Sequence, residues 1–136
     1  MTMSQFVLML KNQIGQLASV TRELAESGVN ILGISAREGL DYTYVRIIVD
    51  DDVKTERILR EENVKFRKEN GIIVVVPHEP GSLYRMSKLL ADAKININYL
   101  YLVVLIPNIV CVLFNVDNHY KAIEVFEKNN IKFYQV

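Results

Sequence analysis

The sequence predicts an α+β fold made of two consecutive modules, each with the element order strand, helix, strand, strand, helix, strand. Three observations lead to this prediction. The chain aligns with itself at an offset of 66 or 67 positions, its apolar residues alternate between strand-like and helix-like spacing, and half of its 136 residues are apolar. Because small domains bury a smaller share of their surface than larger ones, two such halves gain stability by packing together.

The internal repeat consists of matches that keep their order along the chain. At an offset of 66, Gly15 matches Gly81 and Asn30 matches Asn96, and the offset becomes 67 in the second part of each half. Ordered matches at nearly one offset indicate a duplication. The expected modules are residues 1–69 and 70–136.

Apolar periodicity predicts the elements of the first half. Leu17, Val20 and Leu24 recur at spacings of three and four, which predicts a helix that ends at Gly28. Alternating apolar residues predict strands on either side of a turn that contains Gly39. The expected strands are 6–10, 30–37, 42–49 and 64–68, and the expected helices are 16–27 and 53–62.

The second half repeats this order. Leu83, Met86 and Leu90 mark its first helix, and a second helix is expected over 120–128. The expected strands are 72–76, 96–104, 109–116 and 131–135. The order βαββαβ predicts two tandem ferredoxin-like modules, each an antiparallel sheet with both helices on one face.

The third strand of each half predicts which side chains face the helices. They are Val45, Ile47 and Val49 in the first half, and Val112, Phe114 and Val116 in the second. In the second half, Cys111 and Leu113 make the opposite face apolar too. Because a strand that is apolar on both faces is covered on both, we expect the first half or another copy to cover it.

Composition restricts the kinds of protein that this chain can be. Sixteen basic residues balance sixteen acidic ones, which predicts no general attraction to nucleic acid or to an anionic membrane. The lone cysteine, Cys111, is expected to be a small buried hydrophobe. The first residues lack the features of a signal peptide, and no stretch reaches the roughly 18 apolar residues of a membrane span. We therefore expect the protein in the cytoplasm.

The segment from the first strand to the first helix of each half has the most informative sequence. Residues 76–83 read Val-Pro-His-Glu-Pro-Gly-Ser-Leu and residues 10–17 read Leu-Lys-Asn-Gln-Ile-Gly-Gln-Leu, and each is followed by a helix and then by Asn-Ile. This pattern strongly resembles the ACT domain, in which a strand, an Asp-x-Pro-Gly-x-Leu loop and a helix precede Gly-x-Asn-Ile. The resemblance covers nearly the whole chain, twice.

The two halves depart from the family pattern in different ways. Asn12 and His78 stand where the family has its loop Asp, and Ile14 replaces the Pro of the first loop. Lys94 replaces the Gly before Asn-Ile in the second half. The two expected sites are therefore not equivalent.

The resemblance implies a regulatory, allosteric protein that forms a homodimer and acts on an enzyme or regulator in trans. It also implies that a free amino acid binds at the loops between first strand and first helix, near the interfaces between modules. A helix N-terminus presents unpaired N–H groups to a carboxylate, and we expect Asn30 or Asn96 near the same end of the sheet to receive the ammonium group. We predict no catalytic residue, metal site or cofactor. The expected ligand-binding residues are Asn12, Gln13, Ile14, Gly15, Gln16, Asn30, Ile31, Leu32, His78, Glu79, Pro80, Gly81, Ser82, Asn96, Ile97, Asn98 and Tyr99.

Other functions of this fold have weaker support in the sequence. There is no phosphate-binding loop and no recognisable catalytic motif, which argues against an enzyme. The Lys/Arg-Gly-Phe/Tyr motif of RNA-recognition modules and the Cys-x-x-Cys loop of metallochaperones are missing. The remaining alternative is a protein-interaction adaptor without a small-molecule ligand.

Overall fold

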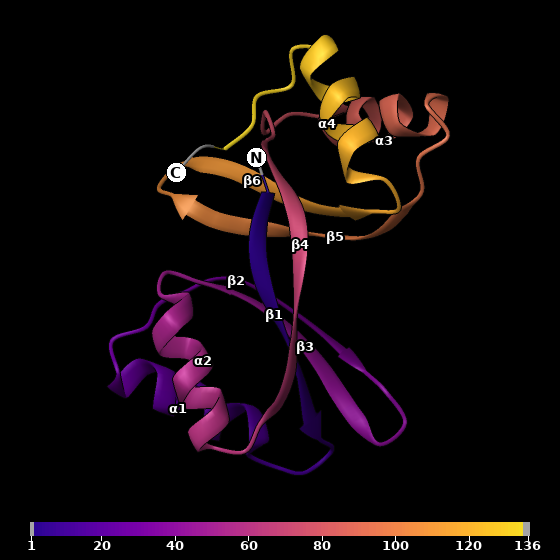
Figure 1. Cartoon of the computed structure of the whole chain (residues 1–136). Helices are drawn as coiled ribbons and strands as arrows, with labels where there is room; N and C mark the ends of the chain where they lie inside the picture. Colours follow the sequence, from indigo (N-terminus) through magenta and orange to yellow (C-terminus); the bar gives the residue numbers. More distant parts are fainter. Residues whose placement is uncertain (1, 135–136) are drawn as a thin grey trace. The chain divides into compact units, whose positions relative to one another are not determined.

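The protein consists of two compact units, and the computed structural model describes residues 2–134 (Figure 1). The first unit is Ser4–Glu69, and the second contains the described residues from Asn70 onward together with Thr2 and Met3. The elements of the chain are β1 (Thr2–Lys11), α1 (Gln16–Glu26), β2 (Ile31–Glu38), β3 (Tyr42–Val49), α2 (Asp52–Glu61), β4 (Lys65–Val75), α3 (Ser82–Asp92), β5 (Ile97–Ile106), β6 (Ile109–Val116) and α4 (His119–Lys128).

The prediction of two separate ferredoxin-like sheets is wrong. The described strands follow one another in a single closed order, β1-β3-β2-β5-β6-β4, together with four helices. The two strands expected at 64–68 and 72–76 are one continuous strand, β4. The antiparallel α+β character of the prediction remains, but the arrangement of the sheet differs.

Gly71 lies within β4, in the interval between the two strands that the sequence predicted. In a sequence, a glycine beside polar residues is typical of a turn. Here a Cβ atom added to Gly71 would lie 2.4 Å from Cγ of Leu113, so the glycine allows a close approach to β6. Glycine, which is typical of turns, here allows close packing in the middle of a strand.

The strand expected at 131–135 is reduced to a short bridge. Phe133 forms an isolated antiparallel bridge with Val74. The N–H of Val75 donates to the carbonyl oxygen of Lys132 at 2.8 Å, and the N–H of Tyr134 donates to that of Ile73 at 3.0 Å. The last predicted position of this strand, Gln135, lies outside the described residues.

Each unit has its own apolar core between the strands and its two helices (Figure 1). The third-strand residues predicted to face the helices do so in both units, because they belong to the same buried clusters as helix residues. In the first unit these helix residues include Leu24 and Leu59, and in the second they include Leu90 and Phe126. Burial of such side chains contributes on the order of 2 kcal/mol each.

The opposite face of β6 is buried as well. Cys111 and Leu113 are both fully buried, as the sequence predicted for small and large apolar residues at these positions. Burial raises the pKa of the Cys111 thiol, which keeps the sulfur in its protonated, unreactive form. The surface that covers this face stays a prediction.

Candidate functional site

The first helix of each unit begins without a side-chain cap. Gly15 precedes α1 with φ of 86°, and Gly81 precedes α3 with φ of 90°, both in the left-handed region that favours glycine. The other two helices are capped by Asp51 and Asn118, whose side-chain oxygens accept an N–H of the first turn at 2.9 and 3.0 Å. The N-termini of α1 and α3 are therefore the ones left to interact with another group.

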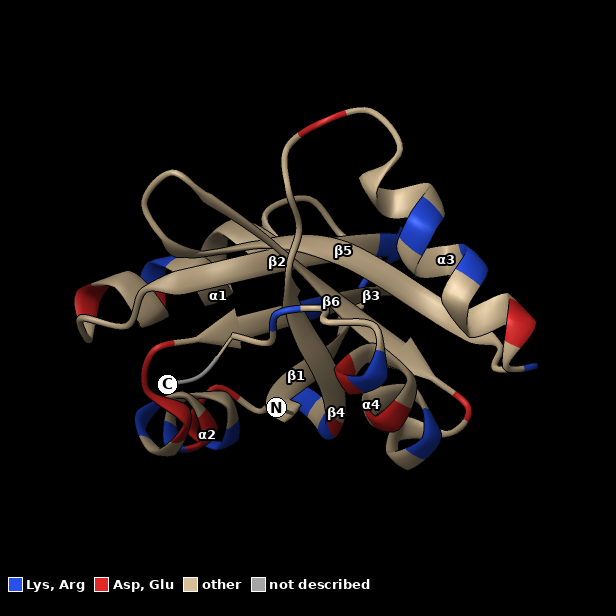
Figure 2. Ribbon diagram, turned by 90° about the horizontal axis from the view of Figure 1, so that it is seen from above, with Lys and Arg blue, Asp and Glu red and all other residues tan. Residues whose placement is uncertain are grey.

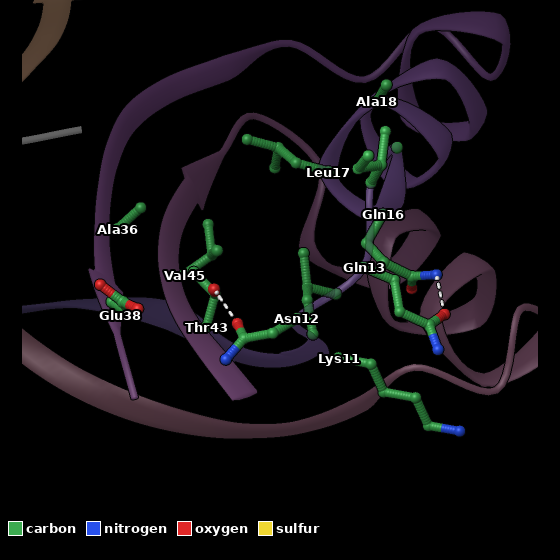
Figure 3. Close-up of a pocket in the computed structure, with 13 residues that line it drawn as sticks. Lys11, Asn12, Gln13, Gln16, Leu17, Ala18, Ala36, Glu38, Thr43 and Val45 are labelled. Atoms are coloured by element: carbon green, nitrogen blue, oxygen red, sulfur yellow. Dashed lines mark hydrogen bonds between the residues drawn. The ribbon is translucent and has the colours of Figure 1, made fainter. Parts of the chain in front are cut away.

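The N-terminus of α1 opens onto a cavity of about 690 Å³ (Figure 3). Leu10 and Val45 are almost completely buried and form its apolar floor, and Leu17, which is 40% exposed, forms part of its wall. Glu38 lies at the end of β2 and lines the cavity from the side opposite Gln13 (Figure 3). The cavity thus combines an apolar floor with polar groups on two sides.

Asn12 ties this loop to the turn between β2 and β3. Its amide nitrogen donates to the carbonyl oxygens of Gly39 at 3.2 Å and Leu40 at 3.3 Å. Its amide oxygen accepts from the hydroxyl of Thr43 at 2.6 Å (Figure 3). Asn12 lines the cavity as a fixed part of its wall, since both ends of its amide already have partners.

Gln13 and Gln16 form the polar side of the cavity next to the helix. The side-chain nitrogen of Gln16 donates to the side-chain oxygen of Gln13 at 3.3 Å (Figure 3). The pair leaves the nitrogen of Gln13 and the oxygen of Gln16 for other partners. Ile14 and Gly15, the other predicted residues of this loop, line the same cavity.

The second unit has a matching but smaller cavity of about 340 Å³ at the N-terminus of α3. The predicted residues His78, Glu79 and Ser82 line it, together with Leu83 and Leu102. Pro80 and Gly81 belong to the same loop but are not part of the lining. Among residues 2–134, the side chain of His78 has no hydrogen-bond or ion-pair partner.

The predicted position of the two asparagines at the loop end of the sheet is wrong. β2 pairs with β3 from Ile31 opposite Val49 to Glu38 opposite Thr43, while β1 ends with Lys11 opposite Tyr42. Asn30 therefore lies at the far end of its own sheet, and the same order of elements places Asn96 far from its loop. A strand of eight residues spans about 23 Å, which separates the two ends.

The asparagine backbone has a structural partner in both units. The N–H of Asn30 donates to Oδ1 of Asp50 at 2.9 Å, and the N–H of Asn96 donates to Oδ1 of Asp117 at 3.1 Å. In each pair the aspartate N–H donates back to the asparagine carbonyl oxygen at 3.1 Å. The repeated pair fixes the start of β2 and of β5.

Asn96 also begins a row of amide side chains in the second unit. Its nitrogen donates to Asn98 at 3.2 Å, Asn98 donates to Asn115 at 2.9 Å, and Asn115 donates to the carbonyl oxygen of Asn70 at 2.9 Å. The row lies at the far end of the sheet from the second loop, with Ile97 and Tyr99 beside it on β5. Ile31 and Leu32 occupy the corresponding place in the first unit and are half-buried.

Several lining residues have no counterpart among the predicted ones. The predictions cover the loops, whereas the strand ends that complete each cavity come from antiparallel pairing, which loop motifs do not reveal. Among these residues, Leu17 and Leu83 could have been found from the sequence, because each extends the apolar face of its helix past the residues of the core. The missed residues are Leu10, Lys11, Leu17, Ala18, Ala36, Glu38, Thr43 and Val45 in the first cavity, and Val76, Pro77, Leu83, Leu100, Tyr101, Leu102, Val110 and Val112 in the second.

The helices carry charges of both signs. Figure 2 shows basic and acidic residues side by side along α2, α3 and α4, where they form ion pairs such as Arg60–Glu56 and Lys128–Glu124, each at 2.8 Å. These helices thus present no field of a single sign to a polyanion. Over residues 2–134, no three His, Cys, Asp or Glu side chains are grouped to hold a metal ion, and no helix has the length and apolarity of a membrane span.

Comparison with known families identifies the fold. The profile of a family described as an ACT domain pair matches residues 1–135. The chain belongs to the ACT domain pair family. A search of curated proteins finds no match. The ACT resemblance of the two loops is therefore confirmed, and the family is a regulatory type of domain.

Solved structures share this ACT pair fold. Protein BT0572 from Bacteroides thetaiotaomicron is 25% identical with a TM-score of 0.91, and the match covers 98% of this chain and 92% of that one. The ligand-free regulatory subunit of aspartate kinase from Thermus thermophilus is 17% identical with a TM-score of 0.64, over 92% and 90% of the two chains. The regulatory subunit of aspartate kinase from Thermus flavus is 16% identical with a TM-score of 0.57, over 92% and 90%.

Proposed function

We propose that this ACT domain pair is a non-catalytic regulatory protein that binds a free amino acid at the loop between its first strand and first helix. The observation that carries the proposal is the repeated arrangement of an uncapped helix N-terminus that opens onto a cavity. The two capped helices, α2 and α4, serve as internal comparisons, because their first turns have the side-chain partner that α1 and α3 lack.

The backbone of the first loop suits a carboxylate. The N–H of Ser19 donates to the carbonyl oxygen of Gly15 at 2.9 Å, whereas among the described residues the N–H groups of Leu17 and Ala18 have no partner. These groups carry the partial positive charge of the helix N-terminus. A Cβ atom added to Gly15 or Gly81 would meet no atom within 4 Å, so a ligand has open space beside the turn.

The volume of the first cavity suits an amino acid with room for its side chain. Ligand cavities typically enclose roughly 300–1,000 Å³ and combine an apolar lining with a few polar groups. The cavity of about 690 Å³ lies within this range, and Leu10, Ala36 and Val45 give the side chain an apolar surface.

A binding module without a catalytic domain acts through a partner. We extend the proposal to a cytoplasmic homodimer that regulates an enzyme or another regulator in trans, with binding modules at residues 1–69 and 70–136. The two Thermus proteins of similar fold are regulatory subunits of aspartate kinase, which supports this kind of role.

A thermal-shift screen of the purified chain against the twenty amino acids, followed by calorimetry, tests the proposal. We expect one or two amino acids to raise the melting temperature, because a ligand at 100 times its Kd adds about 2.7 kcal/mol to the free energy of unfolding. The chemical control is the analogue of each active amino acid that lacks its amino group. A flat response to all twenty would contradict the proposal.

A protein-interaction adaptor is the second candidate function. Leu102 and Val104 on β5 are 65% and 69% exposed, and Tyr84 on α3 is 68% exposed. Neighbouring exposed apolar side chains are typical of protein interfaces. Light scattering after size exclusion tests this surface: a dimer that dissociates in the double variant Leu102→Ser and Val104→Ser supports an interface, and a concentration-independent wild-type monomer opposes it.

A further inference from the structure

A further cavity of the first unit lies where β1 and α2 end and β3 and β4 begin. It encloses about 450 Å³ and is lined by residues of the first unit alone. Lys11, Gln13 and Gln16 line both this cavity and the one at the N-terminus of α1, whereas Tyr42 and Lys65 line only this one. We call it the lysine cavity after its two basic residues.

Neither lysine of this cavity has an acidic partner. The first unit contains four lysines, of which Lys54 and Lys68 form ion pairs with carboxylates at 3.9 and 2.7 Å. Among residues 2–134, the ammonium groups of Lys11 and Lys65 have no ion pair and no hydrogen-bond partner. The two unpaired lysines of the unit therefore line the same cavity.

Tyr42 lies next to both lysines. Lys11 is directly opposite Tyr42 in the pairing of β1 with β3, and side chains opposite each other in an antiparallel pair share one face of the sheet. The side chain of Lys11 extends away from the cavity at α1 in Figure 3. Nζ of Lys65 lies 5.7 Å from the centroid of the Tyr42 ring, where cation–π attraction favours it. Two like charges beside one ring repel each other, and an anion bound in the cavity would offset this repulsion.

The corresponding cavity of the second unit has the same volume but a different lining. It also encloses about 450 Å³, and it includes Lys132, which matches Lys65 at an offset of 67. The positions that match Lys11 and Tyr42 hold a proline and an isoleucine. The fold thus forms a cavity at this position in both units, and the side chains of the first unit give it two ammonium groups in place of one.

The polar groups of the lysine cavity suit a phosphate ester that carries hydroxyl groups. Lysine is a compact positive charge with three donors, and it commonly binds phosphate oxygens. The side-chain nitrogen of Gln13 remains free to donate, because its oxygen accepts from Gln16 at 3.3 Å. Glu62 also lines the cavity; its carboxylate would repel a neighbouring phosphate but can accept from hydroxyl groups. The volume falls within the roughly 300–1,000 Å³ of ligand cavities and leaves room for the organic part.

We infer that the lysine cavity binds the phosphate group of a small, hydroxyl-bearing phosphate ester through Lys11 and Lys65. The inference concerns a different ligand class from the amino acid proposed above, and it does not depend on that proposal.

Calorimetry on the full chain tests the inference with three probes: D-ribose 5-phosphate, inorganic phosphate and D-ribose. We expect ribose 5-phosphate to bind more tightly than inorganic phosphate, and ribose to show no binding at millimolar concentration. Lys11→Gln and Lys65→Gln should each weaken binding of ribose 5-phosphate by about 10- to 100-fold, because each removes a charged donor. Glu62→Gln should strengthen binding of inorganic phosphate by about threefold, because it removes a like charge.

The matched control is Lys132→Gln, which removes the corresponding exposed lysine of the second unit. It should leave the affinity for ribose 5-phosphate within about threefold of wild type, since salt screens distant exposed charges. Thermal unfolding without any probe should give all these variants the melting temperature of the wild type, because the side chains that change are exposed. A loss of affinity at an unchanged melting temperature then reports on recognition and not on folding.

The opposing outcomes are distinct from one another. No binding of either phosphate probe would overturn the site, and so would an equal loss in Lys132→Gln, which would attribute binding to general electrostatics. Unchanged affinity in both Lys11→Gln and Lys65→Gln would place any bound phosphate elsewhere. Equal affinities for inorganic phosphate and ribose 5-phosphate would overturn the hydroxyl-bearing ligand class. The amino-acid screen decides the proposed function separately, so failure of one does not imply failure of the other.

Discussion

Gly15 and Gly71 are both glycines for physical reasons, but the reasons differ. Gly15 has φ of 86° and open space where a side chain would begin. Gly71 has an ordinary backbone conformation, but an added Cβ would lie within 2.6 Å of three side-chain atoms of Leu113. Backbone conformation therefore selects the first glycine, and close packing selects the second.

Substitutions at these two glycines should separate the two causes. Gly15→Ala should lower the free energy of unfolding by about 1–2 kcal/mol, because a left-handed backbone is strained for residues with a Cβ. Gly15→Asn should cost less, since asparagine tolerates this region, and Asn63, Asn108 and Asn130 already adopt it here. Urea unfolding monitored by circular dichroism measures both values.

The contrast at Gly71 completes this test. Gly71→Ala and Gly71→Asn should both destabilise the chain by about 1–3 kcal/mol, because each forces Leu113 to move within a packed core. Leu113→Ala should relieve part of the cost of Gly71→Ala in the double variant. An asparagine tolerated equally at both positions would contradict the distinction between backbone strain and packing.

Sequence reasoning identified the loop residues of the candidate site but not the residues that complete it. Gln13 and His78 follow from a local motif, and the structure places both at their cavities. Glu38 and Val45 reach the first cavity through strand pairing between distant positions, which no local pattern encodes. Asn30 was misplaced for the same reason, because a motif in linear order does not show at which end of a sheet each residue lies.

At the scale of elements, the four helices within residues 2–134 divide into two capped and two uncapped ones. Asp51 and Asn118 cap α2 and α4 through equivalent hydrogen bonds, whereas α1 and α3 have no side-chain cap. Caps stabilise a helix at its start, so their absence at the two cavities leaves backbone groups for a ligand. The division repeats in both units.

Removal of a cap should cost stability without affecting amino-acid binding. Asp51→Ala should lower the free energy of unfolding by about 1 kcal/mol, since the N–H of Lys54 loses its partner at 2.9 Å. Asp51→Ser retains an oxygen that can accept this N–H and should recover most of the loss. Urea unfolding gives the stability, and calorimetry should give an unchanged ligand affinity.

The outcome that would contradict this assignment is specific. If Asp51→Ala weakened an amino-acid hit as strongly as it weakened the fold, the capped helices would share the role assigned here to α1. An unchanged free energy of unfolding would show that the cap contributes nothing to stability.

Helices were predicted well because a period of three to four residues is a local property. The predicted helix over 16–27 is α1 at Gln16–Glu26, and that over 53–62 is α2 at Asp52–Glu61. Strands depend on their partners: β1 extends from Thr2, four residues before its predicted start, and β4 continues through a polar stretch. Pairing supplies hydrogen bonds to residues whose own pattern predicts no strand.

For the whole molecule, the sequence predicts the duplication and the composition of each core, but not the closed strand order. The repeat matches, and inward-facing residues such as Ile47 and Phe114, can be recognised from the linear sequence. The order of six strands depends on which edges pair, and apolar alternation carries no information about that. The continuity of β4 is the feature that distinguishes this arrangement from two modules joined by a linker.

An insertion at the boundary between the units tests that continuity. Four residues, Gly-Ser-Gly-Ser, placed between Glu69 and Asn70 would interrupt β4 directly before Asn70, whose carbonyl oxygen accepts from the side chain of Asn115 at 2.9 Å. We expect the free energy of unfolding to fall by about 2–4 kcal/mol, because each lost hydrogen bond contributes about 1 kcal/mol. Urea unfolding of the whole chain is the measurement.

The same insertion between Pro107 and Asn108 is the matched control, because it lengthens the exposed turn between β5 and β6 without interrupting a strand. Lengthening a turn costs only the entropy of closing a longer loop, about 1 kcal/mol here. The inserted peptide should therefore lower the free energy of unfolding more in a strand than in a linker. If both insertions cost the same, residues 69–70 behave as a linker and the two-module arrangement that the sequence suggests would be restored. A clearly larger loss at Glu69 means that strand pairing continues through this boundary.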